Sequence, residues 1–271
     1  MHPLTSRFAA AYVAIAFVGA GTRLRAQTSI PLFDRIGAAP GTVAFAFPSR
    51  AGVCGDGQSY IRVGRHTVMG NSTEHGYDVS RCVAGPVRVR LTRSAGEVTA
   101  VDATVGPTPS DGATDLGMVT AVEGSAYLLD LAERSDRVAE RAIAPALLGE
   151  GVDAAQRLLA IARTKRGGQG GTRHEPLFWA GQYAAAKLRG GADPFARIDP
   201  FGAEVGCDEK DEQRHAVFVL SQLRHEAAVP SLVDVVQHNR DACIRGTALF
   251  WLVESGDDRA VDVVASVLAG R

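Results

Sequence analysis

Four cysteines, at positions 54, 82, 207 and 243, have the widest choice of chemistry in this sequence, and none belongs to a CxxC pair. Cys54 opens a glycine-rich stretch, where an exposed thiolate would be reactive. The alternative is a disulfide between Cys54 and Cys82, which would close a loop of about 29 residues and stabilise the fold by roughly 3 kcal/mol in the chain-entropy model. We favour the disulfide, because a small sheet with few aromatic residues gains from a cross-link.

A zinc site is a second possible use of the same region, since Zn²⁺ accepts two cysteines and two histidines. The candidate ligands are Cys54, His66, His75 and Cys82, which are 12, 9 and 7 positions apart. Compact zinc fingers place the two ligands of each pair roughly two to five residues apart, so this spacing argues against a metal. We therefore expect no metal and no other cofactor.

Cys207 and Cys243 each precede a helix of a repeated pattern, by 11 and 7 residues from the phenylalanine of that helix. Equivalent positions of stacked repeats lie close together, so a bond between them is one interpretation. Two buried thiols that act as small apolar side chains are the other. The sequence leaves both open.

No catalytic motif accompanies these residues. The sequence has no GxSxG elbow and no GxGxxG after a strand, and the glycines of 167–171 lack the Lys-Ser/Thr of a phosphate loop. The formal net charge is -1, and without Arg7, Arg23 and Arg25 the chain keeps 26 basic and 30 acidic residues, or -4. We predict a protein that is not an enzyme and that binds neither nucleic acid nor, in its mature form, a membrane.

The first 26 residues resemble a signal peptide. Arg7 precedes an apolar run from Phe8 to Ala20, which is too short for a comfortable membrane span, and Ala26 offers a cleavage site. An uncleaved anchor or a buried helix is the alternative. Export to the periplasm or secretion would place the cysteines in an oxidising space.

Residues 27–41 are expected to form a linker or a short helix, and 42–107 a small antiparallel β region. Val43, Phe45 and Phe47 alternate with small or polar residues, and so do Val87, Val89 and Leu91. Ser94-Ala95-Gly96 then predicts a hairpin turn. We expect one sheet of roughly three to five strands, followed by a hinge over 106–117.

Residues 118–271 show a helical period, which predicts the α+β class. Thr120 with Glu123 has the pattern of a capping box. The apolar pattern around Phe178 recurs at Phe218 and Phe250, after intervals of 40 and 32 residues. A period of this length is typical of an α-solenoid built from helical hairpins, with an insertion in 190–212.

This repeat resembles the HEAT repeat, in particular the short PBS-lyase HEAT-like form of bacterial proteins. The residues that carry the resemblance are Ile244, Arg245, Ala248, Leu249, Leu252, Gly256, Asp257, Ala260, Val261, Val264 and Leu268, with Ala228, Val229, Pro230, Leu232 and Val236 in the preceding copy. The whole chain also looks like exported bacterial proteins in which a short β region precedes HEAT repeats. The resemblance implies a scaffold that binds another protein, and it implies no lyase activity.

Two sets of residues are candidates for contact with that partner. Gln182, Gln222 and Glu254 recur at equivalent helix ends and would form a polar row. Arg157 and Arg163, near Lys165 and Arg166, form a basic cluster that would meet an acidic partner or simply be solvated. The alternative function is a small-ligand or metal-binding module centred on the β region and supported by the solenoid.

Overall fold

A computed structural model of the chain confirms the α+β class. Among the residues that it describes there are two four-stranded sheets and nine helices. The described residues are 31–58, 60–64, 66–70, 82–107, 112–167, 171–195, 207 and 210–271. The predicted signal peptide and most of the predicted linker lie outside these ranges, but α1 (Leu32–Ala38) shows that the linker region ends in a short helix. No helix within the described ranges is long and apolar enough to span a membrane.

The first sheet has the strand order β7-β6-β1-β8. Its members are β1 (Val43–Phe47), β6 (Val87–Ser94), β7 (Glu97–Val105) and β8 (Thr114–Met118). The alternating side chains of β1 and β6 put one face of the sheet in the core, and β6 and β7 form the predicted hairpin around Ala95 and Gly96.

The prediction of a single antiparallel sheet and a hinge was wrong in two respects. Strand β8 arises from the segment expected to be a hinge, and it pairs parallel with β1. Its residues show no apolar alternation, because both faces of this edge strand are largely exposed. The second error is the number of sheets.

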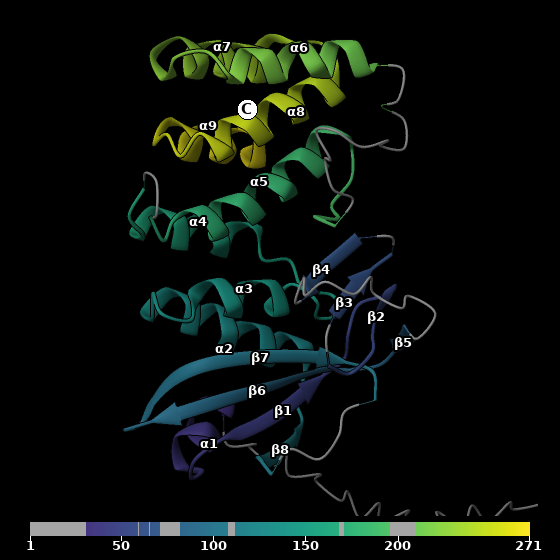
Figure 1. Ribbon diagram of the computed structural model, residues 1–271, viewed down its shortest axis with the longest axis vertical. Coiled ribbons are helices and arrows are strands. Elements are labelled where there is room, and N and C mark those ends of the chain that lie inside the picture. Colours follow the sequence, from purple (N-terminus) through teal and green to yellow (C-terminus); the bar gives the residue numbers. More distant parts are fainter. Residues whose placement is uncertain are drawn as a thin grey trace, which may run out of the picture. The chain divides into compact units, whose positions relative to one another are not determined.

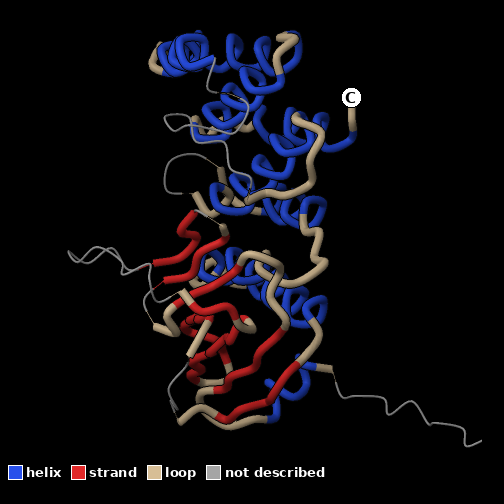
Figure 2. Tube along the Cα trace, turned by 90° about the vertical axis from the view of Figure 1, so that its right-hand side faces the viewer, coloured by secondary structure: helices blue, strands red, loops and turns tan. Residues whose placement is uncertain are grey.

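A second sheet contains β4 (His66–Gly70), β3 (Tyr60–Val63), β2 (Val53–Gly55) and β5 (Val83–Ala84), in that order. Cys54 of β2 is bonded to Cys82, which lies immediately before β5, with a Cα–Cα distance of 5.2 Å. The cross-link joins two neighbouring strands whose pairing is only two residues long. The strands, red in Figure 2, all precede residue 119, and helices α2 to α9 follow them.

Helix α2 (Ala121–Arg134) packs against the first sheet. Tyr127 meets the ring of Phe45 edge-on, at 6.0 Å between centroids. Thr120 caps the helix by accepting a hydrogen bond from the Glu123 amide at 3.1 Å. The Glu123 carboxylate accepts from the amide of Leu32 instead of completing a capping box, so it ties α1 to α2.

The remaining helices form four pairs with α2. They are α3 (Ala139–Ala146), α4 (Ala155–Thr164), α5 (His174–Leu188), α6 (Asp211–Ser221), α7 (His225–His238), α8 (Ala242–Glu254) and α9 (Arg259–Ala269). Helices adjacent in sequence pack together as α2–α3, α4–α5, α6–α7 and α8–α9.

The pairs do not contact one another in sequence order. Helix α8 packs against α5 and also against α6 and α7, as Figure 1 shows. Phe250 lies 6.5 Å from Phe178 of α5, and its neighbour Trp251 lies 5.1 Å from Phe218 of α6, between ring centroids. The last pair of helices is therefore inserted between α4–α5 and α6–α7.

Candidate functional site

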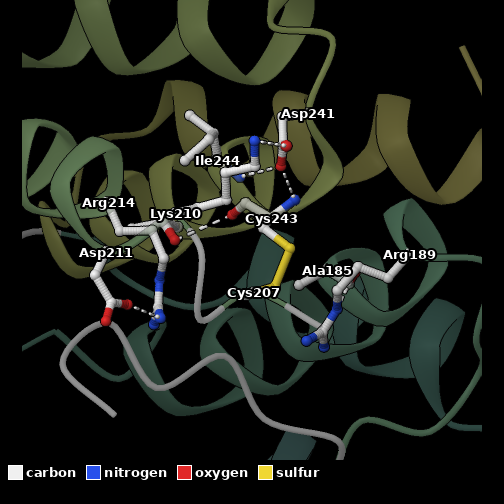
Figure 3. The surroundings of a disulfide bond; sticks show 10 residues. Ala185, Arg189, Cys207, Lys210, Asp211, Arg214, Asp241, Cys243 and Ile244 are labelled. Carbon is white, nitrogen blue, oxygen red and sulfur yellow. Dashed lines mark hydrogen bonds and ion pairs between the residues drawn. A yellow bond between two sulfur atoms is a disulfide. The ribbon is translucent and has the colours of Figure 1, made fainter. Parts of the chain in front are cut away.

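The interval of 40 residues between Phe178 and Phe218 leads across the inserted helix α8. It ends at a second disulfide, between Cys207, which precedes α6, and Cys243 in the first turn of α8. In Figure 3, Ala185 and Arg189 of α5 lie on one side of this bond and Asp211 and Arg214 of α6 on the other. The bond therefore fastens the start of α6 to the start of α8, where three helices meet.

The loop closed by this disulfide contains the whole of α6 and α7. Cys207 is buried, and its carbonyl accepts a hydrogen bond from the Lys210 amide at 3.0 Å. Asp241 caps α8 by accepting from the amides of Cys243 and Ile244. Both ends of the cross-link are thus held by backbone hydrogen bonds in addition to the sulfur–sulfur bond.

The predicted polar row does not form a continuous surface. Gln182 is only 4% exposed, because Gly181 beside it lets Val253 of α8 approach closely. Gln222 is exposed. Glu254 is partly occupied, since its carboxylate lies 3.2 Å from His174 Nε2 and raises the pKa of that histidine.

The predicted basic cluster is largely neutralised. Arg157 forms ion pairs with Asp130, at 2.6 Å, and with Glu133. Lys165 is buried and its ammonium lies 2.5 Å from a carboxylate oxygen of Asp136, whose pKa is lowered by that hydrogen bond. Arg163 is exposed. This surface does not concentrate free positive charge for an acidic partner.

The outward side of α6 was not identified from the sequence. Val219 and Leu223 are 51% and 46% exposed, and Ala216 is exposed as well. The three residues are spaced at i, i+3 and i+7, which places them along one side of the helix and the turn after it. The signal in the sequence was the same apolar period that marks the repeat, and it was assigned to the core.

A cleft of about 590 Å³ lies between the two sheets and helix α3. Strands β4 and β7, each at an edge of its sheet, line it. Side chains of both signs border the cleft, and the closest printed pair joins Arg141 and Asp102 at 3.9 Å. Such a lining suits a ligand that carries both charges, or an extended polypeptide.

No group of three or more histidine, cysteine or acidic side chains that could hold a metal occurs in the described part of the chain. Of the zinc ligands considered above, Cys54 and Cys82 are bonded to each other, so neither offers a thiolate. His75 and the side chain of His66 lie outside the described residues.

The comparisons with known proteins add no identity to this geometry. No protein-family model, no curated protein and no solved structure matches the chain.

Proposed function

We propose that this chain is an exported, non-enzymatic protein whose helical half is a HEAT-like solenoid and binds another polypeptide through the outer side of helices α6 and α7. The observation that carries the proposal is the exposure of Val219 and Leu223 on a pair of helices that has a neighbour on one side only, α8–α9. Two disulfides fit an oxidising compartment.

Repeat arrays protect their ends with polar capping surfaces, because an apolar end would otherwise remain in contact with water. The last copy of the repeat carries such charges, at Asp257, Asp258, Arg259 and Asp262. It lies inside the array, however, and the capping position falls to α6–α7. The outer side of α6 then offers apolar area to a partner.

The preferred occupant is an amphipathic helix of the partner. A helix laid along α6 would bury apolar residues at i, i+3 and i+7 against a row of the same spacing. Such a contact continues the pattern by which α6, α8 and α5 already pack on one another through Phe218, Trp251, Phe250 and Phe178. Shape and apolar burial, rather than chemistry, would provide the affinity.

Site-specific photo-crosslinking in the native envelope tests this proposal. A crosslinking amino acid at position 219 or 223 should capture one discrete polypeptide, and one at Val122 should not. Val122 is a matched control because it is an equally apolar side chain, 67% exposed, on α2. The captured protein, once purified, should bind the Val219→Glu variant at least about tenfold more weakly than wild type, and Val122→Glu like wild type. Equal capture at all three positions, or unchanged affinity of Val219→Glu, would refute the proposal.

The cleft between the sheets favours the second candidate function, a small-ligand module centred on the β region. Its volume of about 590 Å³ is within the range of ligand sites. Removal of the Arg141 charge by Arg141→Gln should abolish binding of a charged ligand there and leave the α6 contact intact. Retention of ligand by that variant would exclude the cleft.

A further inference from the structure

A second cavity, of about 400 Å³, lies where α1, the β6–β7 hairpin and the end of α2 meet. Its walls are mostly apolar. They are formed by Phe33, Ile36, Val98, Tyr127 and Leu131. Three of these side chains are buried, whereas Phe33 is 55% exposed and stands at the rim. The cavity is thus a preformed apolar recess open to solvent.

Two guanidinium groups face this recess, those of Arg93 and Arg134. Arg134 lies over the rings of Phe33 and Tyr127, at 4.9 and 5.5 Å from their centroids. This stacking uses the flat face of the guanidinium and leaves its N–H edge for an acceptor. Arg93 donates to the carbonyls of Ile36 and Ala39, each at 2.6 Å, which holds it and the end of α1 in place.

Neither guanidinium has an acidic partner within ion-pair distance among the described residues. The nearest acidic group of the lining is Glu97, in the hairpin, and it forms no ion pair with Arg93 or Arg134 in the described structure. Two positive charges and one negative charge leave the recess with one unbalanced positive charge. Both arginines also oppose, by their charge, the rise that burial causes in the pKa of the Tyr127 hydroxyl.

We infer that this recess is a binding site for a small monoanion with an apolar body, a carboxylate whose head group meets Arg134 and whose aryl or alkyl part lies against Tyr127 and Leu131. A monoanion balances the charge of the lining, and an apolar body matches its walls. The planar edge of Arg134 can hold a carboxylate with two parallel hydrogen bonds. The site is separate from the outer side of α6 and does not depend on it.

Calorimetric titration of the purified mature protein tests the inference with two probes, 1-naphthoate and decanoate. Each probe is paired with its neutral primary amide, which keeps the apolar body and removes the charge. At least one carboxylate should bind, and its amide should bind roughly tenfold or more weakly. Preference between the probes distinguishes an aryl from an alkyl ligand.

The Arg134→Met variant should weaken carboxylate binding by a similar factor and leave amide binding unchanged. Arg137→Met is the matched control, because Arg137 is an exposed arginine three residues further along the chain that does not line the recess. If Arg134→Met fails to fold, the comparison of carboxylate with amide on the wild-type protein still decides. Binding of neither carboxylate, equal binding of carboxylate and amide, or equal effects of the two arginine variants would overturn the inference.

Discussion

Replacement of Cys207 and Cys243 by alanine should loosen α6 and α7 selectively. The two cysteines are 36 positions apart, and in the chain-entropy model a loop of this length stabilises the folded state by about 3.8 kcal/mol. The figure is an upper value, because a denatured chain with residual structure loses less entropy on cross-linking. We expect an observed loss of about 2–4 kcal/mol.

The loss should be local, because the closed loop contains α6 and α7 and no other helix of the described structure. Without the bond, this pair is held only by its contacts with α8 and α9. Native-state hydrogen exchange, followed on peptides from 211–221 and 225–238, measures its free energy of opening. Peptides from α2 (Ala121–Arg134) provide the internal reference.

The matched control replaces Cys54 and Cys82 by alanine and should loosen β2 and β5 instead. The reasoning is refuted if the Cys207/Cys243 variant keeps wild-type protection in α6 and α7. It is also refuted if protection falls equally in α2, since the cross-link would then act on the whole fold.

Two further perturbations probe contacts at the ends of the argument. Gly124→Ala should cost about 1–3 kcal/mol in the free energy of unfolding, because the added Cβ would lie 2.5 Å from the ring of buried Phe47; Gly37→Ala, with nothing within 4 Å, should be neutral or stabilising in the same denaturant titration. The pair of His174 and Glu254 should stabilise the fold below the unfolded histidine pKa and lose that contribution as pH rises through the raised folded pKa. A double-mutant cycle with His174→Gln and Glu254→Gln should therefore give up to about 0.5 kcal/mol of coupling at pH 6 and less at pH 8.5, and equal coupling at both values would contradict the assignment.

Local elements were predictable because their signals are local. The alternation of Val43, Phe45 and Phe47 reports a buried face of β1, and Thr120 reports the start of α2, without reference to the rest of the chain. Strand β8 gave no such signal. It is short and largely exposed, and its place is set by hydrogen bonds to β1 rather than by apolar side chains.

The order in which helices pack was not predictable from the repeat. Phe178, Phe218 and Phe250 occupy equivalent positions, so α5 presents a face that either α6 or α8 could cover. Only the longer interval before Phe218 indicated that the chain bypasses a layer there. Gln182 was expected at the surface for the same reason, because its burial depends on which helix covers α5.

The insertion of α8 between α5 and α6 is the central claim, since it makes α6–α7 the outer pair. A double-mutant cycle between Phe178→Ala and Phe250→Ala, measured by denaturant unfolding, tests it most directly. The rings are 6.5 Å apart, so we predict a coupling of about 0.5–1.5 kcal/mol. The parallel cycle between Phe178 and Phe218 should give none. Coupling of Phe178 to Phe218 and not to Phe250 would mean that the helices pack in sequence order, and would contradict the account.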